Sequence, residues 1–297
     1  MEGLFYLSYM ASIRLLRFSV LMIIMTCGVS ACFLLKPFEY TDRELAEHYA
    51  HKKITPEYKQ LAFLNKKIHY AKISVNDSLP LLLFIHGAPG AWYGYMNLMD
   101  DTILQKKFKM IAIDRMGYGK SNPGKAELST QLQALSVLEV IHQENNQLQK
   151  VTLLGRSYGS PIAAWIAIRY PQLLNHLYMV SPVIDPAAEK FFWFSGLGKT
   201  KVMQALLPSF MNVATHEKYA HVAEMTKMLG EWRKLFVPTT VLCGENDHIA
   251  DTANYSFAKS HLLNCAAQCL MLKNTGHLII YEKAELLRYL LLRQEKE

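Results

Sequence analysis

The sequence has no run of five or six like charges, and no basic helix in it carries interleaved aromatic residues. Its formal net charge is +7, from 32 lysines and arginines against 25 aspartates and glutamates, and both signs are scattered along the chain. This distribution does not support nucleic-acid binding, and a solvated basic surface accounts for it. An anionic membrane surface would also attract such a charge.

Metal-binding patterns and a disulfide framework are missing as well. No C-x-x-C motif and no cluster of histidines and cysteines occurs, so we predict neither a metal ion nor an organic cofactor. The five cysteines are Cys27, Cys32, Cys243, Cys265 and Cys269. Cys265 and Cys269 could pair in an oxidising compartment, but the apolar runs around Cys243 and Cys269 favour buried, unpaired side chains.

The first 35 residues predict an export signal or a membrane anchor. Arg14 and Arg17 precede an apolar run over residues 18–29, and small residues follow it, which is the order of regions in a secretory signal. Residues 29–32, VSAC, resemble the lipobox of bacterial lipoproteins. That resemblance implies cleavage before Cys32 and attachment of a lipid to its sulfur.

Other interpretations of this segment stay open. Apolar character continues to Leu35, which gives 18 residues from Phe18 and just suffices for an uncleaved transmembrane helix. The segment could instead be a buried core helix, and Met10 could be the true start. The membrane interpretations are favoured, so we expect an exported protein held at a membrane by its N-terminus, in the periplasm or elsewhere in the cell envelope.

Strand and helix patterns alternate along most of the chain, whose 297 residues and 51% hydrophobic content suffice for a large core. Ahead of them, residues 36–67 are predicted to be a helical linker, because Thr41 and Glu44 have the spacing of a capping box. Strands are predicted at 68–75, 81–85, 110–113, 151–154, 177–180, 239–243 and 269–272, and helices at 129–148, 161–170 and 284–292. This alternation predicts an α/β fold with a mostly parallel central sheet and helices on both faces.

One segment interrupts the alternation. Residues 185–236 show no strand pattern but contain aromatic residues, methionines and mixed charges. We therefore predict a helical lid over the site, inserted between two parts of the core, 68–184 and 237–297. The alternative is a set of extra helices packed on the core.

The strongest chemical motif is G-x-S-x-G at residues 155–159, directly after a predicted strand and directly before a predicted helix. A serine on such a turn takes a strained backbone conformation, and the flanking glycines are needed because larger side chains would clash. The hydroxyl of Ser157 is thereby exposed at the top of the sheet. Ser157 is the predicted nucleophile.

Two further glycine-rich turns follow predicted strands. In HGAPG, residues 86–90, the backbone can turn so that an amide faces the nucleophile, as an oxyanion hole requires. The candidate donors are the N–H groups of Ala88 and Tyr158, although a tight turn ending a strand is the simpler alternative. The loop DRMGYGKS, residues 114–121, is predicted to be structural.

These motifs carry a resemblance to a known family. HGAPG, D-x-x-G-x-G-x-S, GRSYGS, GENDHIA and TGH stand in the order and at the strand ends of the alpha/beta-hydrolase superfamily, from Ile68 to the C-terminus. The resemblance implies the alpha/beta-hydrolase fold, with Ser157 as nucleophile, Asp247 within GENDHIA as acid and His277 within TGH as base. The chain order Ser, Asp, His agrees with this hydrolase type, and near neutral pH an imidazole oriented by a carboxylate can take the serine proton.

Other residues compete for these roles. Asp185 follows a predicted strand at a place where some members of the superfamily keep their acid, and Asp251 lies near Asp247. We favour Asp247 over both. His86 is predicted to shape its turn, and the remaining histidines are more often surface or structural residues.

A serine nucleophile implies an acyl-enzyme formed from an ester, amide or thioester and released by water. HGAPG and GRSYGS most resemble the matching stretches of proline iminopeptidases, from which this chain departs at Ala88 and Arg156. In those enzymes lid carboxylates hold the substrate's free amine, and this lid offers Glu189, Glu217, Glu224 and Glu231. An apolar acyl or alcohol group would suit the aromatic lid equally well.

The leading hypothesis is a membrane-anchored, exported serine hydrolase that acts on a small-molecule carboxylic ester or amide. Two alternatives stay open. The same triad supports cofactor-free perhydrolase or lyase chemistry, because a fold does not fix the substrate. The other is a noncatalytic binding protein on the same scaffold. Such a protein would be free to lose the three catalytic side chains, and their presence in this chain counts against it.

Overall fold

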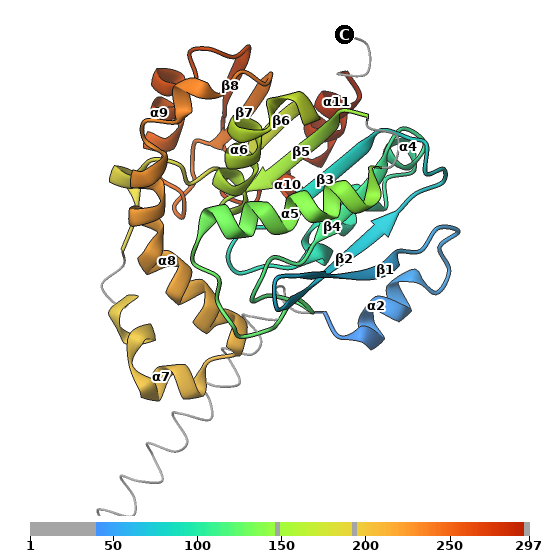
Figure 1. Ribbon diagram of the computed structural model, residues 1–297, viewed down its shortest axis with the longest axis horizontal. Helices are drawn as coiled ribbons and strands as arrows, with labels where there is room; N and C mark the ends of the chain where they lie inside the picture. Colours follow the sequence, from blue (N-terminus) through green and yellow to red (C-terminus); the bar gives the residue numbers. More distant parts are fainter. Residues whose placement is uncertain (1–39, 146–148, 192–194, 294–297) are drawn as a thin grey trace, which may run out of the picture. The chain divides into compact units, whose positions relative to one another are not determined.

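The computed structural model of the chain describes residues 40–145, 149–191 and 195–293 (Figure 1). The chain divides into two compact units, Met1–His48 and Tyr49–Glu297. The signal peptide or membrane anchor predicted over residues 1–35, with the lipid attachment site at Cys32, lies outside the described residues.

The capping box predicted near the N-terminus is confirmed. Helix α2 (Asp42–Tyr49) begins directly after Thr41. The Glu44 amide donates to Thr41 Oγ1 over 3.2 Å, and the Thr41 amide donates to Glu44 Oε2 over 2.9 Å. These reciprocal bonds satisfy amides that the first turn of a helix would otherwise leave without acceptors.

The second unit is built on an eight-stranded sheet with the strand order β1-β2-β4-β3-β5-β6-β7-β8. Its strands are β1 (Glu57–Phe63), β2 (Lys66–Ile73), β3 (Leu81–Ile85), β4 (Lys109–Ile113), β5 (Val151–Arg156), β6 (Leu174–Val180), β7 (Thr239–Gly244) and β8 (Ala267–Leu272). The β1–β2 and β2–β4 pairs are antiparallel, and all the other pairs are parallel. The predicted mostly parallel sheet is confirmed.

Helices lie on both faces of this sheet. The helices of this unit are α3 (Met96–Met99), α4 (Thr102–Gln105), α5 (Thr130–Glu144), α6 (Gly159–Arg169), α7 (Lys201–Leu206), α8 (Ser209–Met228), α9 (Ala253–His261), α10 (Ile279–Glu282) and α11 (Ala284–Arg293), of which α7 and α8 extend beyond the end of the sheet in Figure 1. Helices α5 and α6 pack on each other in front of the strands in Figure 1. Crossovers between parallel strands are right-handed, so α3 and α4, which lead back from β3 to β4, cover the opposite face.

The helical linker predicted over residues 36–67 is wrong in its second half. Strand β1 occupies Glu57–Phe63 and pairs with β2 along its whole length. It is an edge strand of sequence EYKQLAF, and only Leu61 and Phe63 on it pack against the core as partly buried hydrophobic residues. Such a strand lacks the apolar run by which the central strands were predicted.

The centre of the sheet forms the core. Strands β3, β4 and β5 are buried along their whole length. The apolar residues on one face of these strands pack against inward side chains of α5 and α6 in one cluster. This rigid centre carries the carboxyl ends of β3 and β5, where the HGAPG and G-x-S-x-G turns begin.

The predicted insertion contains helices and no strand in its described part. Between residues 185 and 236 lie η4 (Pro186–Ala188), η5 (Ser195–Lys199), α7, α8 and η6 (Trp232–Lys234). Helix α8 buries one side, which includes Val213, Glu217 and Met225. Over the described ranges, none of the helices has the length and apolar character that a membrane crossing requires.

Candidate active site

Ser157 occupies the predicted strand-to-helix turn. It lies between β5 and α6 with a backbone φ of +50°, in the left-handed region. A side chain at Gly155 would come within 2.4 Å of Gly159 O, and one at Gly159 within 2.1 Å of Ile85 O. The two glycines of the motif are therefore required by the close approach of backbone segments, as the sequence predicted.

The two predicted oxyanion donors lie beside Ser157. Ala88, Tyr158 and Ser157 all line one cavity. A Cβ atom built at Gly87 would lie 2.9 Å from Ser157 Cβ and 3.5 Å from Ser157 Oγ, so this turn passes directly over the serine. Among the described hydrogen bonds none uses the N–H of Ala88 or of Tyr158, which leaves both as donors for a ligand.

Asp247 and His277 form a hydrogen-bonded pair. Asp247 follows β7, and its Oδ2 lies 2.8 Å from His277 Nδ1. Its Oδ1 accepts from the amides of Ile249 at 2.9 Å and Ala250 at 2.8 Å. The Asp247 side chain is 3% exposed and the His277 side chain 11% exposed. The carboxylate is thus fully used and fixes the orientation of the imidazole.

The carboxyl end of β6 joins the serine turn to the histidine loop. The Ser157 amide donates to Val180 O over 2.9 Å, and Ser181 Oγ donates to His277 O over 2.9 Å. Residues 180 and 181 therefore hold both loops at the carboxyl end of the sheet. Gly244 contributes too, because a Cβ there would lie 2.4 Å from the carbonyl oxygen of Gly276.

The competing residues have other partners. Asp185 Oδ1 accepts from the Ala187 amide over 2.9 Å at the start of η4. Asp251 pairs with Lys190 over 3.0 Å and also accepts from the Ala253 amide. Both carboxylates therefore stabilise local structure, and the structure joins neither of them to His277.

A cavity of about 580 Å³ opens over Ser157. This is within the range of about 300–1,000 Å³ found for small-molecule sites. The lid segment supplies much of its apolar wall, through Met203, Leu207, Met211, Ala214 and Tyr219. This segment was predicted to be a lid, and it contributes to the wall of the cavity that contains Ser157.

The described charges that line this cavity compensate each other. Glu189 and Lys218 both face it, and Lys218 Nζ donates to Glu189 Oε1. His221 Nε2 lies 3.7 Å from Glu189 Oε2 and 3.1 Å from Val183 O. Burial lowers the pKa of His221, with the nearby Glu189 opposing that shift. A neutral imidazole beside an ion pair leaves this wall without net charge.

Two charged residues near the site were not predicted. Lys218 lies on α8 among scattered lysines of the insertion, and nothing in the sequence pairs it with Glu189. Arg115 belongs to the DRMGYGKS loop, which was predicted to be structural, and its guanidinium reaches the HGAPG turn. Both contacts join segments far apart in the sequence, so no local motif indicates them.

The cysteines and the possible metal ligands can be placed for the described residues. Cys243, Cys265 and Cys269 are free thiols there. Burial raises the pKa of the Cys243 thiol to about 12, so it is a structural residue. In the same part of the chain, no group of three or more His, Cys, Asp or Glu side chains is arranged to hold a metal ion.

Comparisons with known proteins agree with this architecture. Residues 80–222 match the family model described as alpha/beta hydrolase fold. Proline iminopeptidase of Lactobacillus helveticus is 24% identical over 231 residues, which cover 76% of this chain and 69% of that protein.

Solved structures extend the similarity to nearly the whole chain. A putative lipase from Acinetobacter baumannii AYE has a TM-score of 0.65 at 19% identity, and the match covers 87% of this chain and 98% of that one. The crystal structure of a membrane phospholipase A has a TM-score of 0.62 at 19% identity, with 95% of this chain and 99% of that chain covered. At such identities the matches show a shared fold.

Proposed function

Because the chain belongs to the alpha/beta-hydrolase superfamily and is a hydrolase, we propose that it cleaves a carboxylic ester or amide through an acyl-enzyme on Ser157. His277 is the general base and Asp247 the carboxylate that orients it. The observation that carries the proposal is the 2.8 Å Asp247–His277 hydrogen bond at the end of the sheet that also presents Ser157. The positive φ of Ser157 supports its role as nucleophile.

The hydrogen bonds around Asp247 assign the protons of the base. Since Asp247 Oδ2 accepts from His277, Nδ1 carries the imidazole proton and Nε2 holds a free lone pair. Nε2 takes the proton of the Ser157 hydroxyl as Oγ bonds to the acyl carbon. The imidazolium then protonates the departing alcohol or amine as the acyl–O or acyl–N bond breaks. In deacylation, water gives a proton to Nε2 as its oxygen bonds to the acyl carbon. The imidazolium then returns a proton to Ser157 Oγ as the acyl–Oγ bond breaks, which releases the acid and restores the free enzyme.

The carbonyl oxygen becomes negatively charged in each tetrahedral intermediate. The amides of Ala88 and Tyr158 flank Ser157 in the cavity and have no acceptor among the described residues. They are the proposed oxyanion donors. Preorganised donors of this kind are often the largest single contribution to catalysis of acyl transfer.

Fluorophosphonate labelling tests this function. A fluorophosphonate reacts with a serine that an adjacent base activates, so we expect stoichiometric labelling of the folded wild-type protein. Peptide mass spectrometry should find the phosphonyl group on Ser157 alone. Labelling of another serine, or none on a folded protein, would remove the proposal.

The charge balance of the cavity favours an uncharged apolar acyl or alcohol group over a free amine. An ammonium group in an apolar cavity needs a carboxylate that no other cation already satisfies. Glu189 is satisfied by Lys218. This argues for esters of apolar acids rather than aminoacyl amides, in spite of the sequence similarity to proline iminopeptidase.

Removing the cation of Lys218 is expected to change this preference. In Lys218→Met, Glu189 would gain a free acceptor, and a hydrogen bond to a charged group contributes about 1.5–3 kcal/mol. The inhibition constant of octylammonium in the hydrolysis of 4-nitrophenyl butyrate should therefore be about tenfold lower for Lys218→Met than for the wild type. Inhibition by octan-1-ol should stay unchanged, because the two probes differ only in the head group.

Lys227→Met is the matched control for that experiment. Lys227 lies on the same helix and pairs with Glu224, but it is 70% exposed and does not line the cavity. It should leave the octylammonium constant at the wild-type value. An equal gain in both variants, or in neither, would contradict the assignment of Lys218.

A further inference from the structure

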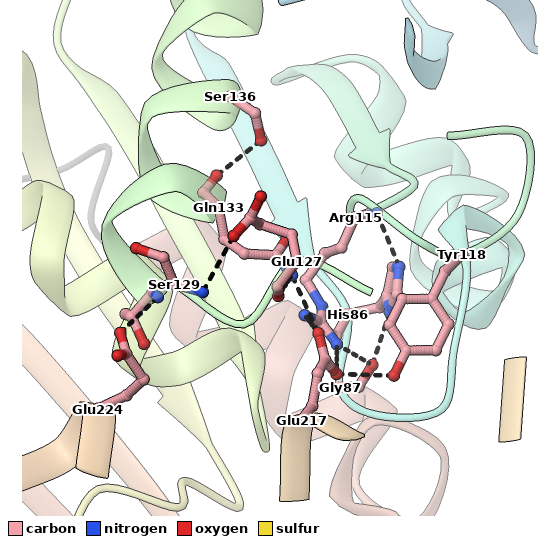
Figure 2. A network of polar contacts seen from close by, with 11 residues as sticks. His86, Gly87, Arg115, Tyr118, Glu127, Ser129, Gln133, Ser136, Glu217 and Glu224 are labelled. Atoms are coloured by element: carbon pink, nitrogen blue, oxygen red, sulfur yellow. Dashed lines mark hydrogen bonds and ion pairs between the residues drawn. The ribbon is translucent and has the colours of Figure 1, made fainter. Parts of the chain in front are cut away.

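A buried ion pair joins the lid helix α8 to the loop after β4. Arg115 is 1% exposed and Glu217 is 0% exposed. Arg115 Nη1 lies 2.7 Å from Glu217 Oε1, and Nη2 lies 2.9 Å from Glu217 Oε2. Figure 2 shows this bidentate ion pair within a larger polar network.

The carboxylate of Glu217 has further partners that complete its solvation by protein groups. Tyr118 OH donates to Oε2 over 2.7 Å, and Gln133 Nε2 donates to Oε1 over 2.9 Å. A buried ion pair is tolerated when such additional hydrogen bonds satisfy its remaining lone pairs. Glu217 is therefore held in one position relative to the core.

The same guanidinium also holds the HGAPG turn. Arg115 Nε donates to His86 O over 2.9 Å, and Nη2 donates to Gly87 O over 3.1 Å. The Arg115 amide donates to His86 Nε2 over 3.0 Å. His86 Nε2 is thus an acceptor, so its Nδ1 carries the proton and donates to Gly87 O over 2.7 Å. Two donors converge on the carbonyl of Gly87.

The position of this carbonyl fixes the direction of the next amide. The Gly87–Ala88 peptide bond is trans, because the cis peptide found in the described chain is Ala88–Pro89. In a planar trans peptide the C=O and N–H bonds point in opposite directions. With Gly87 O drawn toward Arg115, Ala88 N–H points away from the guanidinium. Ala88 lies in the wall of the cavity that contains Ser157.

We propose that Arg115 and Glu217 are positioning residues that set the orientation of the Ala88 oxyanion donor, and that lid helix α8 is thereby part of the catalytic machinery. Neither residue touches the reacting atoms. Glu217 holds Arg115, Arg115 and His86 hold the Gly87 carbonyl, and the rigid peptide plane transmits that position to the Ala88 N–H. This inference rests on the proposed serine-hydrolase function.

Glu217→Gln tests the proposal with the smallest change in shape. The amide keeps one acceptor oxygen but loses the charge and one of the two contacts with Arg115, so the Gly87 carbonyl is held less firmly. Outright loss of an oxyanion donor lowers kcat about 10²–10³-fold, so we expect misalignment to lower it about 10–100-fold. KM for 4-nitrophenyl butyrate should stay near the wild-type value, because the donor acts mainly on the transition state.

Glu224→Gln is the matched control on the same helix. Glu224 accepts from the Thr130 amide over 2.8 Å and from Lys227, without touching Arg115 or the HGAPG turn. It should reduce stability without a comparable loss of kcat. If both variants lose kcat equally, docking of α8 in general is responsible and the positioning role is wrong.

A milder variant keeps the test decisive if Glu217→Gln does not fold, as judged by circular dichroism. Tyr118→Phe removes only the hydroxyl bond to Glu217 Oε2, and it should lower kcat about two- to fivefold at constant KM, a small fraction of the loss for a missing donor. Unchanged kcat in a folded Glu217→Gln or in Tyr118→Phe would overturn the proposal. Failure of the wild type to accept fluorophosphonate on Ser157 would instead overturn the underlying function.

Discussion

Replacing Ser157 by alanine is expected to lower kcat for ester hydrolysis by about 10⁶-fold, as removal of the nucleophile does in other serine hydrolases. The substitution deletes the Oγ atom that would form the acyl-enzyme and leaves the turn intact, since alanine and serine meet the same backbone demand at φ +50°. The remaining rate should be about 10³–10⁴-fold above that of water, from binding and the oxyanion donors. Initial rates with 4-nitrophenyl butyrate at matched protein concentration measure both.

Ser260→Ala is a suitable control for that measurement. Ser260 lies on α9 and donates to Phe257 O over 3.0 Å. It takes no part in the cavity, so its removal should leave kcat unchanged. If Ser157→Ala kept more than about a hundredth of the wild-type rate, another nucleophile would have to operate. Its rate would then have fallen less than about 100-fold, far less than the loss of about 10⁶-fold expected when the nucleophile is removed.

Asp247→Asn is expected to lower kcat by about 10³–10⁴-fold, although it changes one atom. The amides of Ile249 and Ala250 both donate to Oδ1, so an asparagine must place its carbonyl oxygen there. Its NH₂ group then faces His277 Nδ1 and donates to it. The imidazole is forced to carry its proton on Nε2, where the base must be free to accept one.

The competing acids provide the controls for this prediction. Asp185→Asn and Asp251→Asn remove carboxylates that cap local turns and have no contact with His277. Each should keep kcat within a few-fold of the wild type, as surface capping residues act on stability by about 0.5–2 kcal/mol. A severe loss of kcat in Asp185→Asn with a mild one in Asp247→Asn would reverse the assignment of the acid.

Much of the fold could be predicted because its central strands are buried on both faces. Strand β3, LLLFI, has no polar residue, so its apolar run can be recognised from one sequence without an alignment. The positive φ of Ser157 was predictable for a related reason. No larger residue fits at Gly155 or Gly159, because a Cβ atom there would lie 2.4 or 2.1 Å from neighbouring backbone atoms.

The edge strand and the ion pair were not predictable in the same way. Strand β1 is partly exposed on its inward side, so its apolar signal is too weak to overrule the helical capping box before it. Arg115 and Glu217 are 102 positions apart. A sequence does not distinguish a buried charged residue from an exposed one. All four glutamates of the lid were therefore equally good candidates for binding the free amine of a substrate. Only tertiary packing reveals that Glu217 is already occupied.

The two helices of the lid are fastened very differently. Helix α8 is anchored in the core by Glu217 and Glu224, whereas α7 has no buried residue and exposes Val202 and Leu206. Yet both border the space above the serine. Moving α8 away from the cavity would break the buried contacts of Glu217 and Glu224. Moving α7 would displace only a short helix that has no buried residue. The wall that α7 contributes to the cavity is therefore the part whose displacement costs the least free energy.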